Sequence, residues 1–359
     1  TTSVYFEGAY EDEQGAPKGG QERVPLMVEG YNKDGQRPKV QVVLSLITTG
    51  RVPVWYRPWD GNQTDNGGYL ADMTDLRQTL LAPDNAILIG DRKLGHEATM
   101  LAFARQQFLA THPWTDTAKA VWRKTWRQLQ TGRLTWTAVD YASRNEARKP
   151  LPQRPQYQVC EVTRELKDPQ VGQVYPLRWV FTRSSRKAEQ DAQKRAKALQ
   201  AGEQALQRIA GLLGKYDYTT RKTIEARIDK ALRQAKAHPY LTATLAGTDT
   251  DQAWELRWAQ RQEVLADAQS FDGVALLCTN VPGERLSAGA AMRKYKAQVS
   301  VEQTIDFIKS PVQIQPMWLH SPKRVAGLTL LIMIAVLVAA LLEHQVRRWI
   351  AKRASSSTV

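Results

Sequence analysis

The sequence contains few of the residues that build disulfide-bonded or metal-bound frameworks. Its 359 residues include two cysteines, Cys160 and Cys278, too few for a disulfide framework or a cysteine zinc site. Both lie in apolar, strand-like stretches, where we expect reduced thiols in the core. The five histidines are scattered and never show the His-Glu-x-x-His spacing of a zinc-binding helix. These absences are typical of a cytoplasmic protein without a structural zinc site.

The chain also lacks a signal peptide, internal repeats and low-complexity tracts. It begins at Thr1 and not at a methionine, so we expect a fragment or a trimmed chain. It has one long apolar run, residues 325–342, interrupted only by the hydroxyl of Thr329. A helix that is apolar on all sides is either a short membrane span or a helix buried in a large core. Hydropathy alone leaves both open, although basic residues at both ends give no orientation under the positive-inside rule.

Acidic residues are outnumbered by basic ones. Lys and Arg total 50 against 36 Asp and Glu, a net charge of +14, which indicates a polyanionic partner such as nucleic acid or an anionic membrane surface. Residues 183–236 read as a long polar helical region with 14 basic and 6 acidic residues, a net charge of +8. Taken alone, that region is more typical of a solvated helical hairpin than of a specific contact surface.

The first 95 residues predict an α/β pattern. Strands are expected near residues 2–6, 40–48 and 52–56, then a helix over 69–81, and a short buried strand over 86–90 that ends directly on Asp91. Catalytic groups gather at the carboxyl ends of strands in open α/β sheets, which makes Asp91 a candidate acid. Further on we expect helices over 96–148, strands near 157–163 and 175–182, a hairpin over 241–258 and a buried strand at 274–279.

A predicted helix over residues 287–310 carries the second candidate acid. Tyr295, Glu302 and Lys309 are spaced by seven residues and Gln298 is one turn before Glu302, so all four share one side of a helix. A carboxylate with a lysine on one side and a phenol on the other suits a metal-bound phosphate. The spacing by itself is also typical of an ordinary amphipathic helix.

The spacing Tyr-x2-Gln-x3-Glu-x6-Lys resembles the Tyr-x2-Arg-x3-Glu-x6-Lys motif of a large group of bacterial insertion-sequence DDE transposases. Other family motifs follow in order over essentially residues 1–345. These are the Thr-Thr-Ser-Val-Tyr-Phe-Glu-Gly run at 1–8, the segment 30–41, Pro53-Val54 with the loop 61–65, Ile89-Gly-Asp-Arg92, and Asp272-Gly273 with Thr279-Asn280.

The resemblance implies a ribonuclease H-like mixed sheet flanked by helices, with a mostly β plus helical subdomain inserted between the second and third acids. It implies domains at 1–112 and 269–359 for the two parts of the catalytic core and 113–268 for the insertion. Asp91 and Glu302 are then catalytic metal ligands, and Tyr295, Gln298 and Lys309 contact DNA phosphates. Two Mg²⁺ ions, with Mn²⁺ as a substitute, drive cleavage and strand transfer. In the same picture the apolar run at 325–342 packs beneath the core.

The implied partners are double-stranded DNA, at the transposon ends and the target, and a second copy of the chain in the DNA complex, in the bacterial cytoplasm with the nucleoid and without a membrane. Some positions depart from the family pattern. Gln298 replaces an arginine, which removes a cationic phosphate clamp, and Lys93-Leu94 replaces Gly-Met. The family's first catalytic Asp directly precedes the Thr-Thr-Ser run and is missing from this chain. An inactive DNA-binding remnant of a transposase and a tail-anchored membrane protein therefore stand as alternatives.

Overall fold

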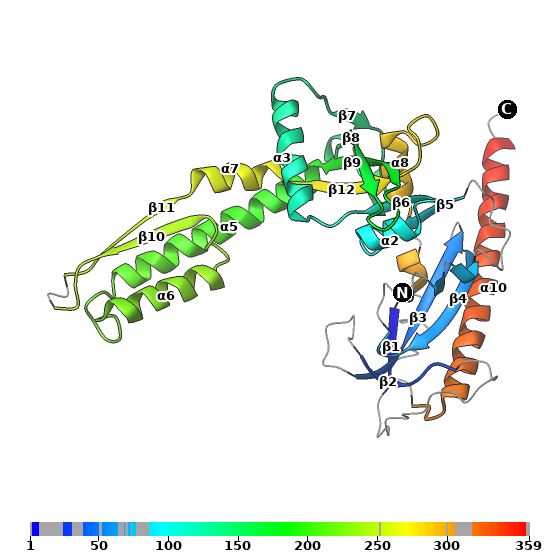
Figure 1. The fold of residues 1–359 in the computed structure, drawn as a ribbon, viewed down its shortest axis with the longest axis horizontal. Coiled ribbons are helices and arrows are strands. Elements are labelled where there is room, and N and C mark those ends of the chain that lie inside the picture. The colour runs from blue at the N-terminus through cyan, green and yellow to red at the C-terminus, as the bar shows by residue number, and fades with distance from the viewer. Residues whose placement is uncertain are drawn as a thin grey trace. The chain divides into compact units, whose positions relative to one another are not determined.

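The computed structural model is a mixed α/β protein that divides into two compact units. Unit 1 comprises Thr1–Thr111, Leu166–Tyr175 and Arg293–Val359, and unit 2 comprises His112–Glu165 and Pro176–Met292. The chain forms mixed sheets flanked by helices (Figure 1). The structure describes residues 2–6, 24–30, 39–49, 52–63, 68, 71–72, 74–76, 86–250, 253–298, 301–305 and 318–356.

Unit 1 is built around a long central strand, β3 (Lys39–Thr49). It pairs antiparallel with β1 (Thr2–Tyr5), β2 (Val28–Gly30) and β4 (Val52–Asp60), with a register shift between Ile47 and Thr48. The β-branched run that predicted β3 alternates along the strand, so that Val42 and Leu44 fall on the same face of the sheet. Both side chains are buried in the apolar cluster of unit 1.

Two glycines allow the turn after β4 to close against the sheet. A Cβ on Gly61 would lie 2.0 Å from the Gln41 carbonyl oxygen and 2.3 Å from that of Val28. A Cβ on Gly30 would lie 2.0 Å from the Gly61 carbonyl oxygen. The Gly61 amide donates to the Leu26 carbonyl at 3.1 Å, and Gln41 Nε2 donates to the Gly61 carbonyl at 2.8 Å. Backbone packed this closely leaves no room for a side chain at either position.

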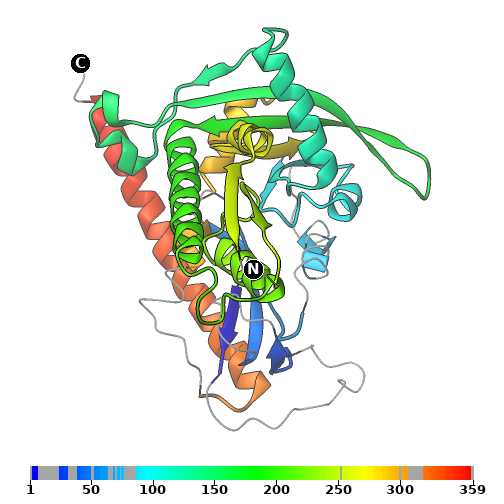
Figure 2. The ribbon, with the colours of Figure 1, turned by 90° about the vertical axis from the view of Figure 1, so that its left-hand side faces the viewer.

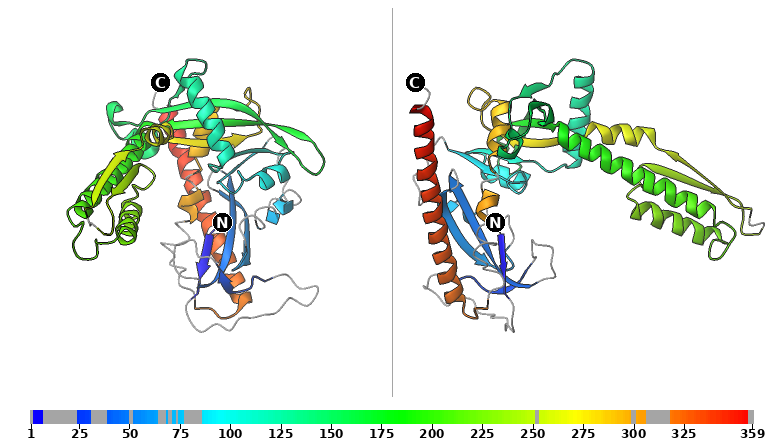
Figure 3. Two further views of the ribbon diagram at one scale, coloured as in Figure 1. Left: turned by 60° about the vertical axis from the view of Figure 1, so that its left-hand side comes forward. Right: turned by 180° about the vertical axis from the view of Figure 1, so that it is seen from behind.

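The apolar run at 325–342 lies within the long helix α10 (Pro322–Ser356), which packs along the β1–β4 sheet; both panels of Figure 3 show the helix beside these strands. Its buried residues Val325, Ile332, Met333 and Val336 join Val4, Phe6, Met27, Val42 and Leu44 in one apolar cluster. At the edge of this contact the Tyr56 hydroxyl and Thr329 Oγ1 are 2.7 Å apart.

Burial of α10 is confined to that one face. The opposite face exposes large apolar side chains: Leu330, Leu331, Ile334, Val338, Leu341, Leu342, Val346, Trp349 and Ile350. The described residues contain one helix long and apolar enough to cross a membrane, Pro322–Ile350, within which an 18-residue window has a mean hydropathy of 2.9. We expected this helix to be buried beneath the core. Only its sheet-facing side is buried, because the sheet of unit 1 covers one side of α10.

The remainder of unit 1 includes two parallel strands. β5 (Ile87–Gly90) pairs with β6 (Gln107–Thr111), and the short helix α2 (Glu97–Ala102) connects them. The prediction of helices throughout 96–148 was wrong here, because β6 is a strand whose Phe108, Leu109 and Ala110 have no exposed surface. A short run buried on both faces lacks the alternation that marks a strand in a sequence.

Unit 2 contains the strands β12 (Val274–Thr279), β9 (Val174–Ser184), β8 (Tyr157–Lys167) and β7 (Thr137–Val139), which neighbour one another in that order. The helix α3 (Asp116–Gln130) contributes Trp122, which is fully buried against Phe181 and Phe271. The Trp122 indole N–H donates to the Ser270 carbonyl at 3.2 Å, so the largest core side chain also satisfies its polar atom. Short elements complete this part: α4 (Arg144–Ala147) and the 3-10 turn η1 (Leu151–Gln153).

The basic region 183–236 forms the predicted helical hairpin. Helices α5 (Ser185–Ala210) and α6 (Arg221–Gln234) pack on the antiparallel strands β10 (Leu241–Ala246) and β11 (Glu255–Gln260), before α7 (Gln262–Ser270) leads to β12. Figure 2 shows the two helices beside this hairpin. Leu206, Ile224, Leu232 and Leu241 are buried between helices and strands. The hairpin and both helices are therefore confirmed as elements.

The division into compact units differs in part from the domain bounds implied by the resemblance, and those bounds stay a prediction. The first change of unit is at Thr111–His112, beside the predicted end of the first domain at 112, whereas the last is at Met292–Arg293 instead of 268. Within unit 1, β1 and β5 belong to different sheets. The mixed α/β class is established, and the finer ribonuclease H-like arrangement stays a prediction.

Candidate functional site

Asp91 lies at the carboxyl edge of the parallel pair β5–β6. Gly90 is opposite Ala110, so the next residues along, Asp91 and Thr111, come at the same edge of the pair. The Asp91 side chain is exposed, and its Oδ1 accepts a hydrogen bond of 2.9 Å from the Lys93 amide. A carboxylate held by a backbone amide at the end of a strand has its remaining lone pairs directed to solvent and available to a ligand.

The buried side chain of Leu94 stabilises the turn after Asp91. Leu94 is fully buried, and its amide donates to the Asp91 carbonyl at 3.2 Å. Sequence comparison with the transposase pattern marked Lys93-Leu94 as a departure that could reshape this loop. Here the backbone of Lys93 binds the carboxylate and the side chain of Leu94 anchors the turn, so both residues help to hold Asp91 in place.

Tyr295 reaches the same edge from α8 (Ala288–Lys296). Its hydroxyl is 3.3 Å from Thr111 Oγ1, at the end of β6. This contact joins residues 184 positions apart in the sequence. Because Thr111 is beside Asp91 in the strand register, it brings the phenol to the edge that carries the first candidate acid.

The charges of both candidate acids act on the pKa of the Tyr295 hydroxyl. Burial raises the pKa of the Tyr295 phenol above its usual value, and the negative charges of Asp91 and Glu302 raise it further. The hydrogen bond with Thr111 and the positive charge of Arg92 act on this pKa in the opposite direction. A carboxylate raises the pKa of a phenol only when it is near enough for its charge to act. Asp91 and Glu302 are thus both near enough to the Tyr295 hydroxyl for their charges to act on its pKa.

The predicted single helix over 287–310 is interrupted between Tyr295 and Glu302. Helix α8 ends at Lys296, a turn follows at 297–298, and helical structure is described again at 301–305. The Gln298 amide donates to the Tyr295 carbonyl at 3.0 Å, a tighter spacing than that of an α-helix. The prediction of one continuous helix over 287–310 is therefore wrong at 297–298.

Of the other two predicted site residues, Gln298 alone lies within the described residues. The Gln298 side chain has a buried Oε1 without a hydrogen-bond partner among the described residues, and it supplies no positive charge where the family pattern has arginine. Lys309 lies outside the described residues. In the parts of the chain that the structure describes, no group of three or more His, Cys, Asp or Glu side chains is positioned to hold a metal ion. Two carboxylates therefore make up the candidate metal-binding set.

Thr111 and Arg92 belong to this cluster, and sequence reasoning missed them. Thr111 ends the unpredicted strand β6 and is followed by His112-Pro113. A residue that precedes proline favours extended backbone, which is the signal that could have indicated a strand end here. Arg92 stood within the Gly-Asp-Arg motif, but nothing in the spacing indicated that its charge would act on a tyrosine 203 positions later.

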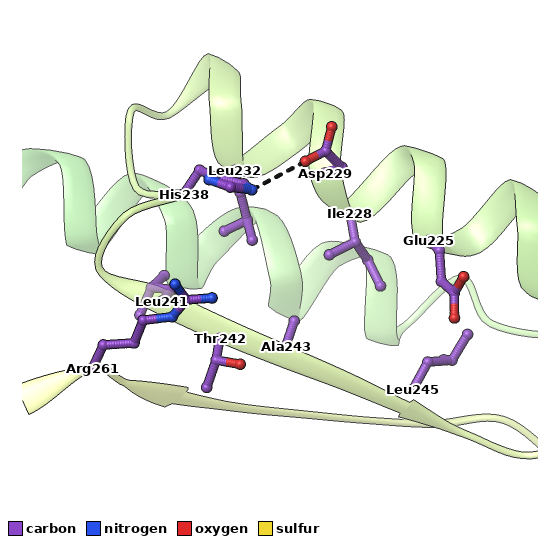
Figure 4. A pocket seen from close by; sticks show the side chains of 10 residues that line it. All are labelled: Glu225, Ile228, Asp229, Leu232, His238, Leu241, Thr242, Ala243, Leu245 and Arg261. Carbon is purple, nitrogen blue, oxygen red and sulfur yellow. Dashed lines mark ion pairs between the residues drawn. The ribbon is translucent and has the colours of Figure 1, made fainter. Parts of the chain in front are cut away.

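A separate pocket of about 250 Å³ lies in unit 2, between α6 and β10 (Figure 4). Its apolar side is formed by residues such as Ile228 and Leu241, and its rim carries an ion pair of 3.2 Å between His238 and Asp229. None of the predicted site residues lines it. The pocket has no part in the Asp91–Tyr295–Glu302 cluster.

No family model matches the chain, and a search of curated proteins finds no significant relative.

Proposed function

We propose that this chain is the catalytic part of an insertion-sequence DNA transposase, which cleaves and joins DNA by Mg²⁺-dependent phosphoryl transfer. The observation that carries the proposal is the 3.3 Å contact between the Tyr295 hydroxyl and Thr111 Oγ1, which brings Tyr295 to the carboxyl edge of β5–β6 where Asp91 lies. The charges of Asp91 and Glu302 both raise the pKa of this phenol. The transposase motifs name the same two acids and the same tyrosine. Nothing in their sequence spacing alone requires Asp91 to approach a helix some 200 residues away.

Each group has a defined role in the proposed reaction. Asp91 and Glu302 supply oxygen ligands of the kind that Mg²⁺ prefers. When bound, the metal neutralises charge on the phosphate and lowers the pKa of the attacking water or DNA 3′-hydroxyl. Tyr295 keeps its proton because its pKa is raised, so the hydroxyl can donate a hydrogen bond to a phosphate oxygen. The oxygen nucleophile forms a new P–O bond as the P–O bond to the leaving 3′-oxygen breaks.

The exposed carboxylates of Asp91 and Glu302 offer the hard oxygen ligands that Mg²⁺ prefers, and neither is engaged in an ion pair among the described residues. The family's complete set holds two ions and contains a third acid, which directly precedes its Thr-Thr-Ser run. The mixed α/β class of both units is compatible with the proposed ribonuclease H-like core and inserted subdomain. Double-stranded DNA, a second copy of the chain and a place on the bacterial nucleoid are the partners and location that accompany this proposal.

The test is strand cleavage on DNA from the ends of the encoding element, with Mg²⁺ or with EDTA. The assay uses the chain extended by one aspartate before Thr1, the position of the family's first acid. Asp91→Asn and Glu302→Gln should each lower cleavage by roughly 10²–10³-fold, the usual cost of removing one group that stabilises developing charge. Asp116→Asn serves as the control, because that side chain is fully exposed and bound only to Lys119 on α3.

Cleavage that survives Glu302→Gln would refute the site. DNA binding without cleavage by any form of the chain would instead identify an inactive transposase remnant.

One observation favours a second candidate function, that of a membrane-anchored basic protein. The apolar outer face of α10 is uncovered in unit 1, and arginines at 347 and 348 follow its apolar part. Basic residues and tryptophan are common at the ends of membrane-spanning helices. Fractionation decides between the two functions: a chain recovered in the membrane pellet after a high-salt and carbonate wash supports the anchor, and a chain released with DNA supports the transposase.

A further inference from the structure

Helix α5 presents a row of positive charges that no carboxylate neutralises. Arg186, Lys194, Lys197 and Arg208 are exposed, and none of them forms an ion pair with another described residue. They are separated by 8, 3 and 11 positions, which are sums of three- and four-residue steps and keep them on one side of the helix. We call these four residues the α5 cation row.

The other basic residues of α5 have structural partners. Lys187 is paired with Asp191, and Arg195 forms a two-bond ion pair with Asp272, with distances of 2.7 and 2.5 Å. The side chains of Arg195 and Asp272 are only 10% and 12% exposed. This pair joins α5 to the segment before β12, so Arg195 is unavailable to a ligand although its sequence neighbours are free.

The acidic residues of α5 are mostly engaged elsewhere. Asp191 binds Lys187 and also accepts a hydrogen bond from the Gly273 amide, and Glu203 accepts one of 2.9 Å from Gln260 Nε2. Glu189, exposed in the second turn of the helix, is the single acid of α5 left outside such a contact among the described residues. The exposed side between Arg186 and Arg208 therefore carries a clear excess of positive charge over the length of the helix.

The residues between the cations are amides and alanines. Gln190, Gln193, Gln200 and Gln204 are exposed on the same half of the helix, opposite the face on which Leu206 and Ile209 are buried. Glutamine amides donate hydrogen bonds to phosphate oxygens, as lysine and arginine do. A helix that binds a lipid surface needs large apolar side chains on its outer face, and this face has none.

We propose that the α5 cation row binds the phosphate backbone of duplex DNA without reading its sequence. The inference rests on the proposed function for the choice of DNA as the polyanion. The row extends over about 33 Å at 1.5 Å per residue, close to the length of one turn of duplex DNA at about 34 Å. A straight helix of this length that lies along one side of the duplex can reach several of the phosphates that face it. Its role is to hold DNA, whereas the chemistry belongs to Asp91 and Glu302.

The experiment measures equilibrium binding of the full chain to a random-sequence duplex in EDTA, over a series of salt concentrations. Each lost phosphate contact should reduce the slope of log K against log salt by about 0.9. The variant Arg186→Gln/Lys194→Gln/Lys197→Gln/Arg208→Gln should therefore lose about 3 to 4 from that slope, with affinity at low salt falling roughly 100-fold or more.

The matched control removes the same charge from other exposed lysines of unit 2 that are free of ion pairs among the described residues. This variant is Lys215→Gln/Lys222→Gln/Lys230→Gln/Lys236→Gln, and its slope should change by less than about 1. Thermal unfolding followed by circular dichroism checks both variants. If the four-site α5 variant does not fold, the double variant Lys194→Gln/Lys197→Gln replaces it and should lose about 2 from the slope.

Three outcomes would overturn the proposal: an unchanged slope in the α5 variant, an equal loss in both variants, or a loss of binding to anionic lipid vesicles without a loss of binding to DNA. The first returns the row to a solvated surface, the second makes binding a property of total charge, and the third assigns the row to a membrane. Because the assay contains EDTA, it does not depend on cleavage. A chain that binds DNA through α5 but fails every cleavage assay contradicts the proposed function alone.

Discussion

At the scale of single residues, the candidate site is described by the charged side chains that act on the pKa of the Tyr295 phenol. Tyr295 is held by Thr111, a residue at the end of a neighbouring strand, while Asp91, Glu302 and Arg92 set the electrostatic environment of its hydroxyl. The raised pKa has a definite sign for stability. An ordinary phenol ionises near pH 10 in the unfolded chain, so the stabilisation that accompanies this shift is present below pH 10 and is lost as the pH rises through the folded pKa.

We expect the Tyr295 phenol to titrate above pH 10 in the folded chain, because burial and two nearby carboxylates disfavour phenolate. The measurement is the ultraviolet phenolate absorbance of the chain minus that of Tyr295→Phe. In Asp91→Asn and Glu302→Gln the transition should move down towards pH 10 without reaching it, because burial persists. Asp116→Asn should leave it unchanged, since that carboxylate is exposed on α3. A midpoint that neither site variant moves would show that these acids are not close to Tyr295.

At the scale of elements, α5 contains adjacent residues with opposite roles. Arg195 is nearly buried in its ion pair with Asp272, and Lys194, the residue before it, is exposed. Sequence reasoning grouped the two as one basic stretch, because a helix turns by about 100° per residue and only packing decides which side is covered.

Arg195→Gln should therefore destabilise unit 2 by about 3–5 kcal/mol, since it leaves Asp272 charged and buried without its partner. Lys194→Gln, on the same helix and with the same change of charge, should alter the free energy of unfolding by less than about 0.5 kcal/mol. Urea unfolding measures both. Equal effects of the two variants would contradict the structural role of the Arg195–Asp272 pair.

At the scale of the whole molecule, two compact units carry separate parts of the proposed activity, with the acids in unit 1 and the α5 cation row in unit 2. Unit 1 depends on α10, which completes its core on one face and exposes apolar side chains on the other. Adjacent residues again distinguish the two faces, since Ile332 is 7% exposed and Leu331 is 65% exposed.

Ile332→Ala should lower the free energy of unfolding of unit 1 by about 2–5 kcal/mol, the usual cost of truncating a buried isoleucine. Leu331→Ala should change the free energy of unfolding by less than about 0.5 kcal/mol, because the Leu331 side chain is mostly exposed to solvent and its truncation loses few packing contacts. Chemical unfolding of the purified chain in aqueous buffer makes the comparison. If Leu331→Ala costs as much as Ile332→Ala, the outer face of α10 is covered in solution and the helix has a second partner.

The sequence by itself determined the features that depend on local pattern. β-branched runs, apolar periodicity and turn residues were sufficient to predict β3, β5, the β10–β11 hairpin, α5 and α6, and an acid at the end of β5. Only the tertiary structure decided which distant residues meet, because a contact such as Thr111 with Tyr295 has no trace in local spacing. It also decided that β6 is a strand, that the helix with Glu302 is interrupted after Tyr295, that Arg195 is structural, and that one face of α10 is covered. Burial and pairing are properties of the packed chain, so neighbouring residues of similar chemistry, such as Lys194 and Arg195, acquire different roles only when the elements come together.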